Sequence, residues 1–127
     1  MIEIAIDGTA ASGKGTLGKN LSVKYGFPYL DTGLMYRKIA HEVIKKNNFY
    51  DKPLWTISCE IAKKLNFFEL EKKNYRTEQV ASLASKIASY SKLRQILNSK
   101  QIDFANYSKK KFGGCVLDGR DIGTKIL

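Results

Sequence analysis

A glycine-rich segment between a strand pattern and a helix pattern constrains the fold of this chain more than any other feature. Residues 2–7 alternate Ile with other side chains, which predicts a strand that runs directly into Gly8. Residues 14–25 suit a helix that ends at Gly26. Small residues in such a loop let backbone N–H groups turn toward an anion, and the helix N-terminus adds positive potential. The predicted phosphate-binding cradle consists of Gly8, Thr9, Ala10, Ala11, Ser12, Gly13, Lys14, Gly15 and Thr16.

The lysine of this cradle is placed to reach the β- and γ-phosphates of a bound nucleotide. The general pattern has Ser or Thr directly after the lysine, whereas here Gly15 follows Lys14 and Thr16 supplies the hydroxyl. This variant is similar to the form found in nucleoside monophosphate kinases. An accidental Gly- and Ser-rich turn is the alternative, and the combination of strand, spacing, lysine and helix argues against it.

Near the C-terminus of the sequence, another predicted strand ends in a carboxylate. Residues 114–118 predict a short buried strand that ends in Asp118. A phosphate-binding α/β fold places such a carboxylate beside its first strand to help hold a metal shell. An acidic residue at a strand end is common in α/β proteins, so the interpretation depends on its pairing with the cradle. Residues 118–124 then place two carboxylates and Arg120 between glycines.

The remaining elements follow from apolar periodicity and turn residues. No repeat or linker divides the chain, which predicts one domain. We expect a short strand over 27–30 and helices over 31–46, 54–65, 77–89 and 91–106. Thr77 is a good N-cap for the third of these helices. The basic run Lys109–Lys111 precedes Phe-Gly-Gly and is expected in a solvated loop.

The positive charge of the chain is supplied almost entirely by lysine. The formal net charge is +10, from 22 basic and 12 acidic residues. The lysines are spread along the sequence without a stacking platform of aromatics and arginines, so the charge does not predict a nucleic-acid-binding face. The few arginines mark candidate positions where a planar fork of donors is required. They are Arg37, Arg76, Arg94 and Arg120.

The residue types that could indicate a metal centre, a disulfide or a membrane span are sparse. Cys59 and Cys115 lie in apolar stretches without metal-ligand spacing and are expected to be buried free thiols. His41 has no second ligand at metal spacing and is expected at the surface. No apolar run approaches the roughly 18 residues that a membrane span needs. The sequence thus predicts a cytoplasmic protein with no membrane partner.

These motifs together resemble the bacterial cytidylate kinase family along essentially the whole chain. The resemblance is carried by Ile-Asp-Gly at 6–8, Leu30–Arg37, Arg76–Val80, Ser85, Arg94 and Asp118–Thr124. It implies an α/β fold, with a P-loop parallel-sheet core formed by 1–31 and 112–127 and a helical monophosphate-binding insert at about 32–111. It also implies transfer of the γ-phosphoryl of ATP to CMP or dCMP, with Mg²⁺.

The family resemblance assigns roles to individual residues. Arg37 and Arg120 match the clamps on the acceptor phosphate and, with Lys14, form the implied catalytic set. Thr32 and Tyr36 match contacts to the acceptor nucleotide. The implied cytosine readers are Ser85, Arg94 and Asp121, and the implied metal-shell residues, acting directly or through water, are Thr16 and Asp118. Arg76 either joins this site or pairs with a carboxylate at the start of its helix, and Asp31 either caps its helix or opens the acceptor pocket.

The sequence departs from the family pattern after Thr124. The family continues with further core strands and an arginine-bearing lid, whereas this chain has only Lys125–Leu127. We therefore expect a chain that lacks the lid and the last core strands, with its first strand at a sheet edge and apolar surface exposed. Kinase activity would then be impaired unless a longer reading frame or a second polypeptide supplies a C-terminal fragment. The alternative is a non-catalytic remnant that binds nucleotide or phosphate.

Overall fold

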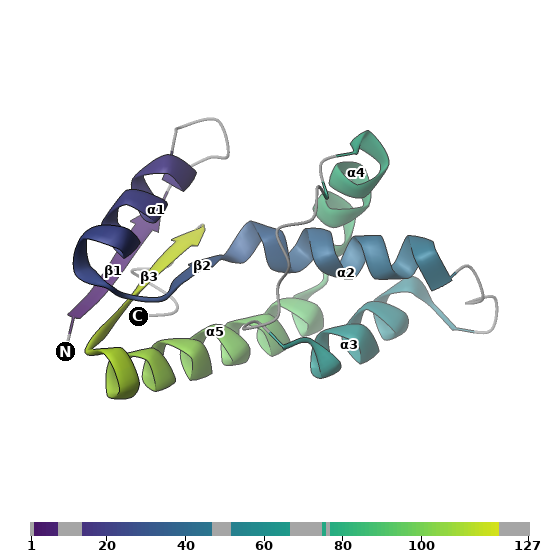
Figure 1. Ribbon diagram of the computed structural model, residues 1–127. Coiled ribbons are helices and arrows are strands. Elements are labelled where there is room, and N and C mark those ends of the chain that lie inside the picture. Colours follow the sequence, from purple (N-terminus) through teal and green to yellow (C-terminus); the bar gives the residue numbers. More distant parts are fainter. Residues whose placement is uncertain (1, 8–13, 47–51, 67–74, 76, 120–127) are drawn as a thin grey trace. The chain divides into compact units, whose positions relative to one another are not determined.

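The computed structural model describes residues 2–7, 14–46, 52–66, 75 and 77–119. Strands and helices follow one another in an α/β arrangement, as Figure 1 shows. Their order is β1 (Ile2–Asp7), α1 (Lys14–Tyr25), β2 (Tyr29–Asp31), α2 (Thr32–Lys46), α3 (Leu54–Lys64), α4 (Glu78–Ile87), α5 (Ser91–Phe112) and β3 (Gly114–Gly119). The predicted α/β class is confirmed. No helix among these residues is long and apolar enough to cross a membrane.

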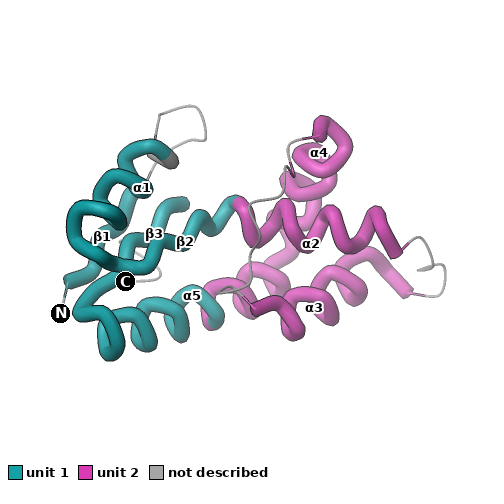
Figure 2. Tube along the Cα trace, viewed as in Figure 1, with its two compact units in different colours: residues 1–33, 100–127 teal, residues 34–99 magenta. Residues whose placement is uncertain are grey.

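The chain divides into two compact units (Figure 2). Unit 1 comprises residues 1–33 and 100–127, and unit 2 comprises residues 34–99. One boundary falls just after the start of α2, and the other falls within α5. The assignment of 1–31 and 112–127 to a core, and of about 32–111 to an insert, remains a prediction.

The described residues of unit 1 form a three-stranded parallel sheet. Its strand order is β1-β3-β2, so the last strand in the sequence lies between the first two. Every residue of β3 is buried, which is typical of a central strand in a parallel sheet covered on both faces. Within the described part of the chain β1 pairs with β3 alone, in agreement with the expectation of an edge position for the cradle strand.

The segments that join the strands of unit 1 are fixed by glycines at helix ends. Gly26 follows α1 and Gly113 follows α5, with φ values of 68° and 83°. Glycine is the residue that adopts this left-handed backbone without steric cost, and it ends helices for that reason. Each glycine thus turns the chain out of a helix and toward the next strand.

Unit 2 is built from helical segments with an apolar interior. Its residues with little or no exposure include Met35, Ile39, Val43, Ala62, Tyr75, Val80, Ile87, Leu93 and Leu97. The α4 helix begins after Thr77, whose side chain accepts a hydrogen bond from the Val80 backbone N–H at 3.2 Å. The predicted N-cap is confirmed. Both cysteines are buried and free, also as predicted.

The predicted bounds of two elements are wrong. The second strand covers Tyr29–Asp31 rather than 27–30, because Pro28 has no N–H to donate to the ladder and Asp31 pairs opposite Asp118. The last helix continues past residue 106 to Phe112, so Lys109–Lys111 form its last turn and not a loop. Cations are stabilised at a helix C-terminus by the helix dipole, and Lys109 also pairs with Glu3 of β1.

Candidate functional site

The carboxyl edge of the sheet in unit 1 brings together residues that are far apart in the sequence. Asp118 of β3 is in register with Ile6 of β1 and with Asp31 of β2. Because the strands are parallel, this edge is also where β1 runs toward the predicted cradle. The carboxyl ends of strands in open α/β sheets are the usual location of ligand sites.

The flanks of the predicted cradle are as expected. The β1 strand ends at Asp7 and α1 begins at Lys14, with Gly15 and Thr16 in its first turn. Thr16 is exposed. The cradle residues Gly8 to Gly13 lie outside the described residues, and so do Arg76, Arg120 and Asp121. Their roles therefore remain predictions.

Asp118 is the most buried charged residue of this edge, with no exposed surface. The Tyr29 hydroxyl donates a hydrogen bond to its carboxylate Oδ2 at 2.5 Å. The Thr32 hydroxyl donates to the backbone carbonyl oxygen of the same residue at 2.8 Å. A buried carboxylate without partners would be costly, so these bonds hold Asp118 in place at the end of β3.

The surroundings of Tyr29 keep its hydroxyl protonated, so that it acts as a hydrogen-bond donor. Burial raises the pKa of its phenol well above the usual range, and the hydrogen bond to Asp118 and the charges of Asp118 and Asp31 raise it further. Its ring lies against α1 at Gly18, where any Cβ would overlap Cε2 of the ring. Gly18 therefore provides the space that the aromatic ring occupies.

The residues at this edge suit a magnesium ion that is bound together with a nucleotide. Mg²⁺ prefers oxygen donors and is commonly held by one or two carboxylates together with substrate phosphates. Asp118 offers such a carboxylate beside the strand that leads to the cradle. Within the described ranges no group of three or more His, Cys, Asp or Glu side chains forms a metal cluster. A single carboxylate joined by phosphate oxygens is the arrangement that these residues fit.

Unit 2 carries the other predicted substrate residues. Tyr36 and Arg37 are half-buried on α2, whereas Ser85 on α4 and Arg94 on α5 are exposed. Burial raises the pKa of Tyr36, and the positive charge of nearby Arg94 opposes that rise. The structure thus brings Tyr36 and Arg94 together. Among the described residues, Arg37 and Ser85 form no hydrogen bond or ion pair with another predicted site residue.

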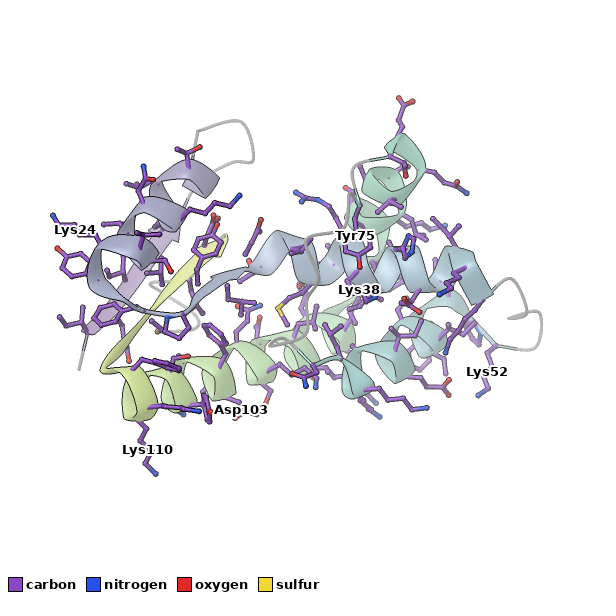
Figure 3. The ribbon with its side chains drawn as sticks, in the orientation of Figure 1. Lys24, Lys38, Lys52, Tyr75, Asp103 and Lys110 are labelled. Atoms are coloured by element: carbon purple, nitrogen blue, oxygen red, sulfur yellow. The ribbon has the colours of Figure 1, made fainter. Side chains whose placement is uncertain are left out.

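His41 belongs to a small cluster of side chains around Tyr75. The His41 and Tyr75 rings lie 4.9 Å apart between centroids, and the Lys38 amine lies 5.6 Å from the Tyr75 centroid. Figure 3 labels Lys38 and Tyr75, which lie close together. Lys38 also donates to Glu42 at 3.0 Å. His41 is half-buried, and the buried Tyr75 ring provides it with an aromatic neighbour.

Sequence reasoning missed Tyr29 and Gly18. From its sequence neighbours alone, Tyr29 is an aromatic residue in a short strand and Gly18 is a glycine in a helix. Neither pattern indicates a functional site. The available signals were a hydroxyl two residues before Asp31 at a strand end, and a glycine inside an apolar helical pattern. An isolated glycine in a helix costs stability and often has a packing reason.

Comparison with known proteins gives a consistent result. The family model described as cytidylate kinase matches residues 4–127. A cytidylate kinase of Acidiphilium cryptum is 46% identical over 126 residues, which cover 99% of this chain and 56% of the relative. Cytidylate kinases of Bartonella quintana and Caulobacter sp. are 44% and 41% identical, each over 97% of this chain and 54% of the relative. The chain spans about half the length of the curated relatives it matches.

Proposed function

This chain belongs to the cytidylate kinase family, and on that premise we propose that it provides the phosphate cradle and acceptor-binding residues of an enzyme that transfers the γ-phosphoryl of ATP to CMP or dCMP. The observation that carries the proposal is the family match over residues 4–127, in a chain whose sheet places Asp118 beside the strand that leads to the cradle. The products are ADP and CDP or dCDP. The same proposal places the enzyme in the cytoplasm with its soluble nucleotides, and assigns it no nucleic-acid or membrane partner.

This reaction requires the protein to position the two nucleotides and to neutralise the charge of the transferred phosphoryl group. Lys14 and the backbone N–H groups of residues 8–16 would hold the donor phosphates, with Thr16 and Asp118 in the metal shell. Magnesium, when bound with ATP, neutralises the phosphate charge. Arg37 and Arg120 would grip the acceptor phosphate, because a guanidinium binds phosphate through two parallel hydrogen bonds. The nucleophile is already a phosphate oxygen, so no general base is required.

Recognition of cytosine is assigned to Ser85, Arg94 and Asp121, with Thr32 and Tyr36 beside the acceptor nucleotide. Cytosine presents acceptors at O2 and N3 and a donor at its exocyclic amine, which a guanidinium and a carboxylate satisfy together. Uracil would direct its N3–H at Arg94 and its O4 at Asp121. A site built for specific hydrogen bonds rejects such an analogue strongly, since its polar groups are left unpaired.

The test is a coupled assay of ADP formation with CMP, dCMP, UMP and AMP as acceptors. It uses the 127-residue chain and the same chain continued by the C-terminal part of the Acidiphilium cryptum relative that lies beyond the match. We expect the extended chain to phosphorylate CMP and dCMP well ahead of UMP. We expect the 127 residues alone to show little turnover, because lid arginines of the kind implied by the resemblance are worth about 10³-fold or more in rate. Preference for UMP or AMP would contradict the proposal.

A non-catalytic nucleotide-binding role is the second candidate, favoured by the half-length match. Lys14→Met separates binding from turnover. We expect calorimetry to show loss of Mg·ATP binding in this variant, whereas Lys19→Met, an exposed lysine of the same helix, keeps it. An extended chain that binds Mg·ATP but never phosphorylates CMP would favour the second candidate. Unchanged binding in Lys14→Met would contradict the cradle itself.

A further inference from the structure

The hydroxyl of Tyr29 is tied to the one carboxylate that the proposed function places in the metal shell. The bond joins Tyr29 of β2 to Oδ2 of Asp118 in β3, over 2.5 Å. The two side chains come from adjacent strands, since Tyr29 is in register with Val116, two residues before Asp118. The bond thus crosses the sheet at its carboxyl edge.

Packing restricts the Tyr29 ring to this position. The ring meets α1 at Gly18, where the Cβ of any larger residue would overlap Cε2 of the ring. The Thr32 hydroxyl donates a hydrogen bond to the backbone carbonyl oxygen of Asp118, and the two oxygens lie 2.8 Å apart. Asp118 is therefore fixed at its main chain by Thr32 and at its carboxylate by Tyr29, and it is itself fully buried.

Packing alone does not require the hydroxyl of Tyr29. Phenylalanine would fill the same volume against Gly18, and the hydroxyl adds only the bond to the carboxylate. A second-sphere hydrogen bond of this kind sets the orientation of a metal-binding carboxylate, and its loss typically weakens metal binding by about 10- to 100-fold.

We propose that Tyr29 is a positioning residue that orients the Asp118 carboxylate toward the magnesium of the bound Mg·ATP complex. The inference rests on the proposed function, because it takes the metal-shell role of Asp118 from there. It adds a residue that acts through Asp118 and touches neither the nucleotide nor the acceptor.

The first test measures binding of Mn²⁺·ATP by electron paramagnetic resonance, with Mn²⁺ as the probe for Mg²⁺. It compares the full 127-residue chain with Tyr29→Phe and with the matched control Tyr25→Phe, a half-exposed tyrosine of the same unit. We expect Mn²⁺·ATP affinity to fall about tenfold in Tyr29→Phe and to stay unchanged in Tyr25→Phe. Circular dichroism establishes that each variant is folded. Unchanged affinity in folded Tyr29→Phe would overturn the inference.

A second test needs no disruptive substitution. A 3-fluorotyrosine introduced at position 29 alone reports its distance from Mn²⁺ through broadening of its fluorine resonance, an effect that falls off steeply with distance. We expect Mn²⁺·ATP to broaden this signal strongly. The same label at position 25 serves as the control, because α1 has 12 residues and places Tyr25 roughly 17 Å along the helix from Lys14, at about 1.5 Å per residue. A sharp signal at position 29 in the presence of Mn²⁺·ATP would overturn the inference even if Tyr29→Phe does not fold.

The two tests separate this inference from the proposed function. A protein that binds Mn²⁺·ATP in a Tyr29-dependent way and never phosphorylates CMP would refute the kinase proposal and support the positioning role. A protein that phosphorylates CMP with unchanged Mn²⁺·ATP affinity in Tyr29→Phe would do the opposite. Absence of Mn²⁺·ATP binding by both the 127-residue chain and the extended chain would refute both.

Discussion

Cys115 shows how burial in the central strand controls the chemistry of a single residue. Its thiol is fully buried in β3. Burial raises the pKa of this thiol to about 11, the charge of Glu3 adds to the rise, and Lys109 opposes it. The thiolate is the reactive form of cysteine, so Cys115 is an inert packing residue in the folded chain.

This shift predicts a loss of stability at alkaline pH. The unfolded chain releases the Cys115 proton near the ordinary pKa of 9.0, and the folded chain releases it near 11. Between these values the unfolded state binds fewer protons, so the free energy of unfolding falls as pH rises. Urea titrations across this range measure the fall. Cys115→Ala, which lacks the thiol, should lose less stability over the same range, and equal losses would contradict the prediction.

At the residue scale, the local signals that the structure confirms are the strand that leads to Asp118 and the N-cap at Thr77, whereas the site role of Asp118 stays a prediction. An apolar run closed by a carboxylate predicts the strand, and a hydroxyl directly before a helical pattern predicts the cap. Tyr29 was not found, because its partner lies 89 positions away and only the sheet topology brings the two together. The Tyr36–Arg94 proximity has the same long-range character, although both residues had been selected from the family resemblance.

At the scale of elements, α4 depends on its cap. The helix has only 10 residues, and helices of this length are marginal without tertiary contacts. Thr77 satisfies the Val80 backbone N–H, one of the N–H groups that the first turn leaves without a helical partner. Capping is therefore a measurable part of the stability of this helix.

We expect Thr77→Ala to lower the free energy of unfolding by about 1 kcal/mol. Thr77→Ser keeps the hydroxyl and should retain most of the stability. Urea denaturation of the two variants and the parent provides the measurement. Equal stability of the Ala and Ser variants would show that the hydrogen bond to Val80 contributes nothing.

The α5 helix shows why element boundaries are harder to predict than element types. The run of lysines before Phe-Gly-Gly has loop composition, yet it completes the helix. Its location at the C-terminal end of the helix dipole and the Lys109 contact with Glu3 of a distant strand favour helix over loop. A rule based on local composition cannot include the contact between Lys109 and Glu3, because Glu3 lies far away in the sequence.

At the scale of the whole molecule, the sheet of unit 1 combines an edge strand with exposed apolar groups. Ile2 on β1 is 51% exposed, and on α1 Leu17 and Val23 are 51% and 85% exposed. Edge strands with apolar neighbours are templates for association between copies. The net charge of +10 opposes such association through repulsion, which salt screens over about 10 Å at 0.1 M.

We therefore expect the 127-residue chain to self-associate increasingly as salt concentration rises, as measured by light scattering. Ile2→Lys places a charge on the edge strand and should reduce the association. Ile102→Lys, at an exposed apolar position on α5 of the same unit, adds the same charge away from the edge and should reduce it less. Equal effects of the two variants would mean that total charge, and not the β1 edge, controls association.

The position of β3 between β1 and β2 also determines when this sheet can assemble. The first strand pairs with a segment more than a hundred residues later, from Ile2 opposite Gly114 to Asp7 opposite Gly119. During synthesis on the ribosome, β1 and α1 emerge early and must wait for nearly the whole described chain before their central partner is available. Such long sequence separation slows folding and leaves intermediates exposed. The β1 strand therefore stays without its partner until synthesis has passed Gly119.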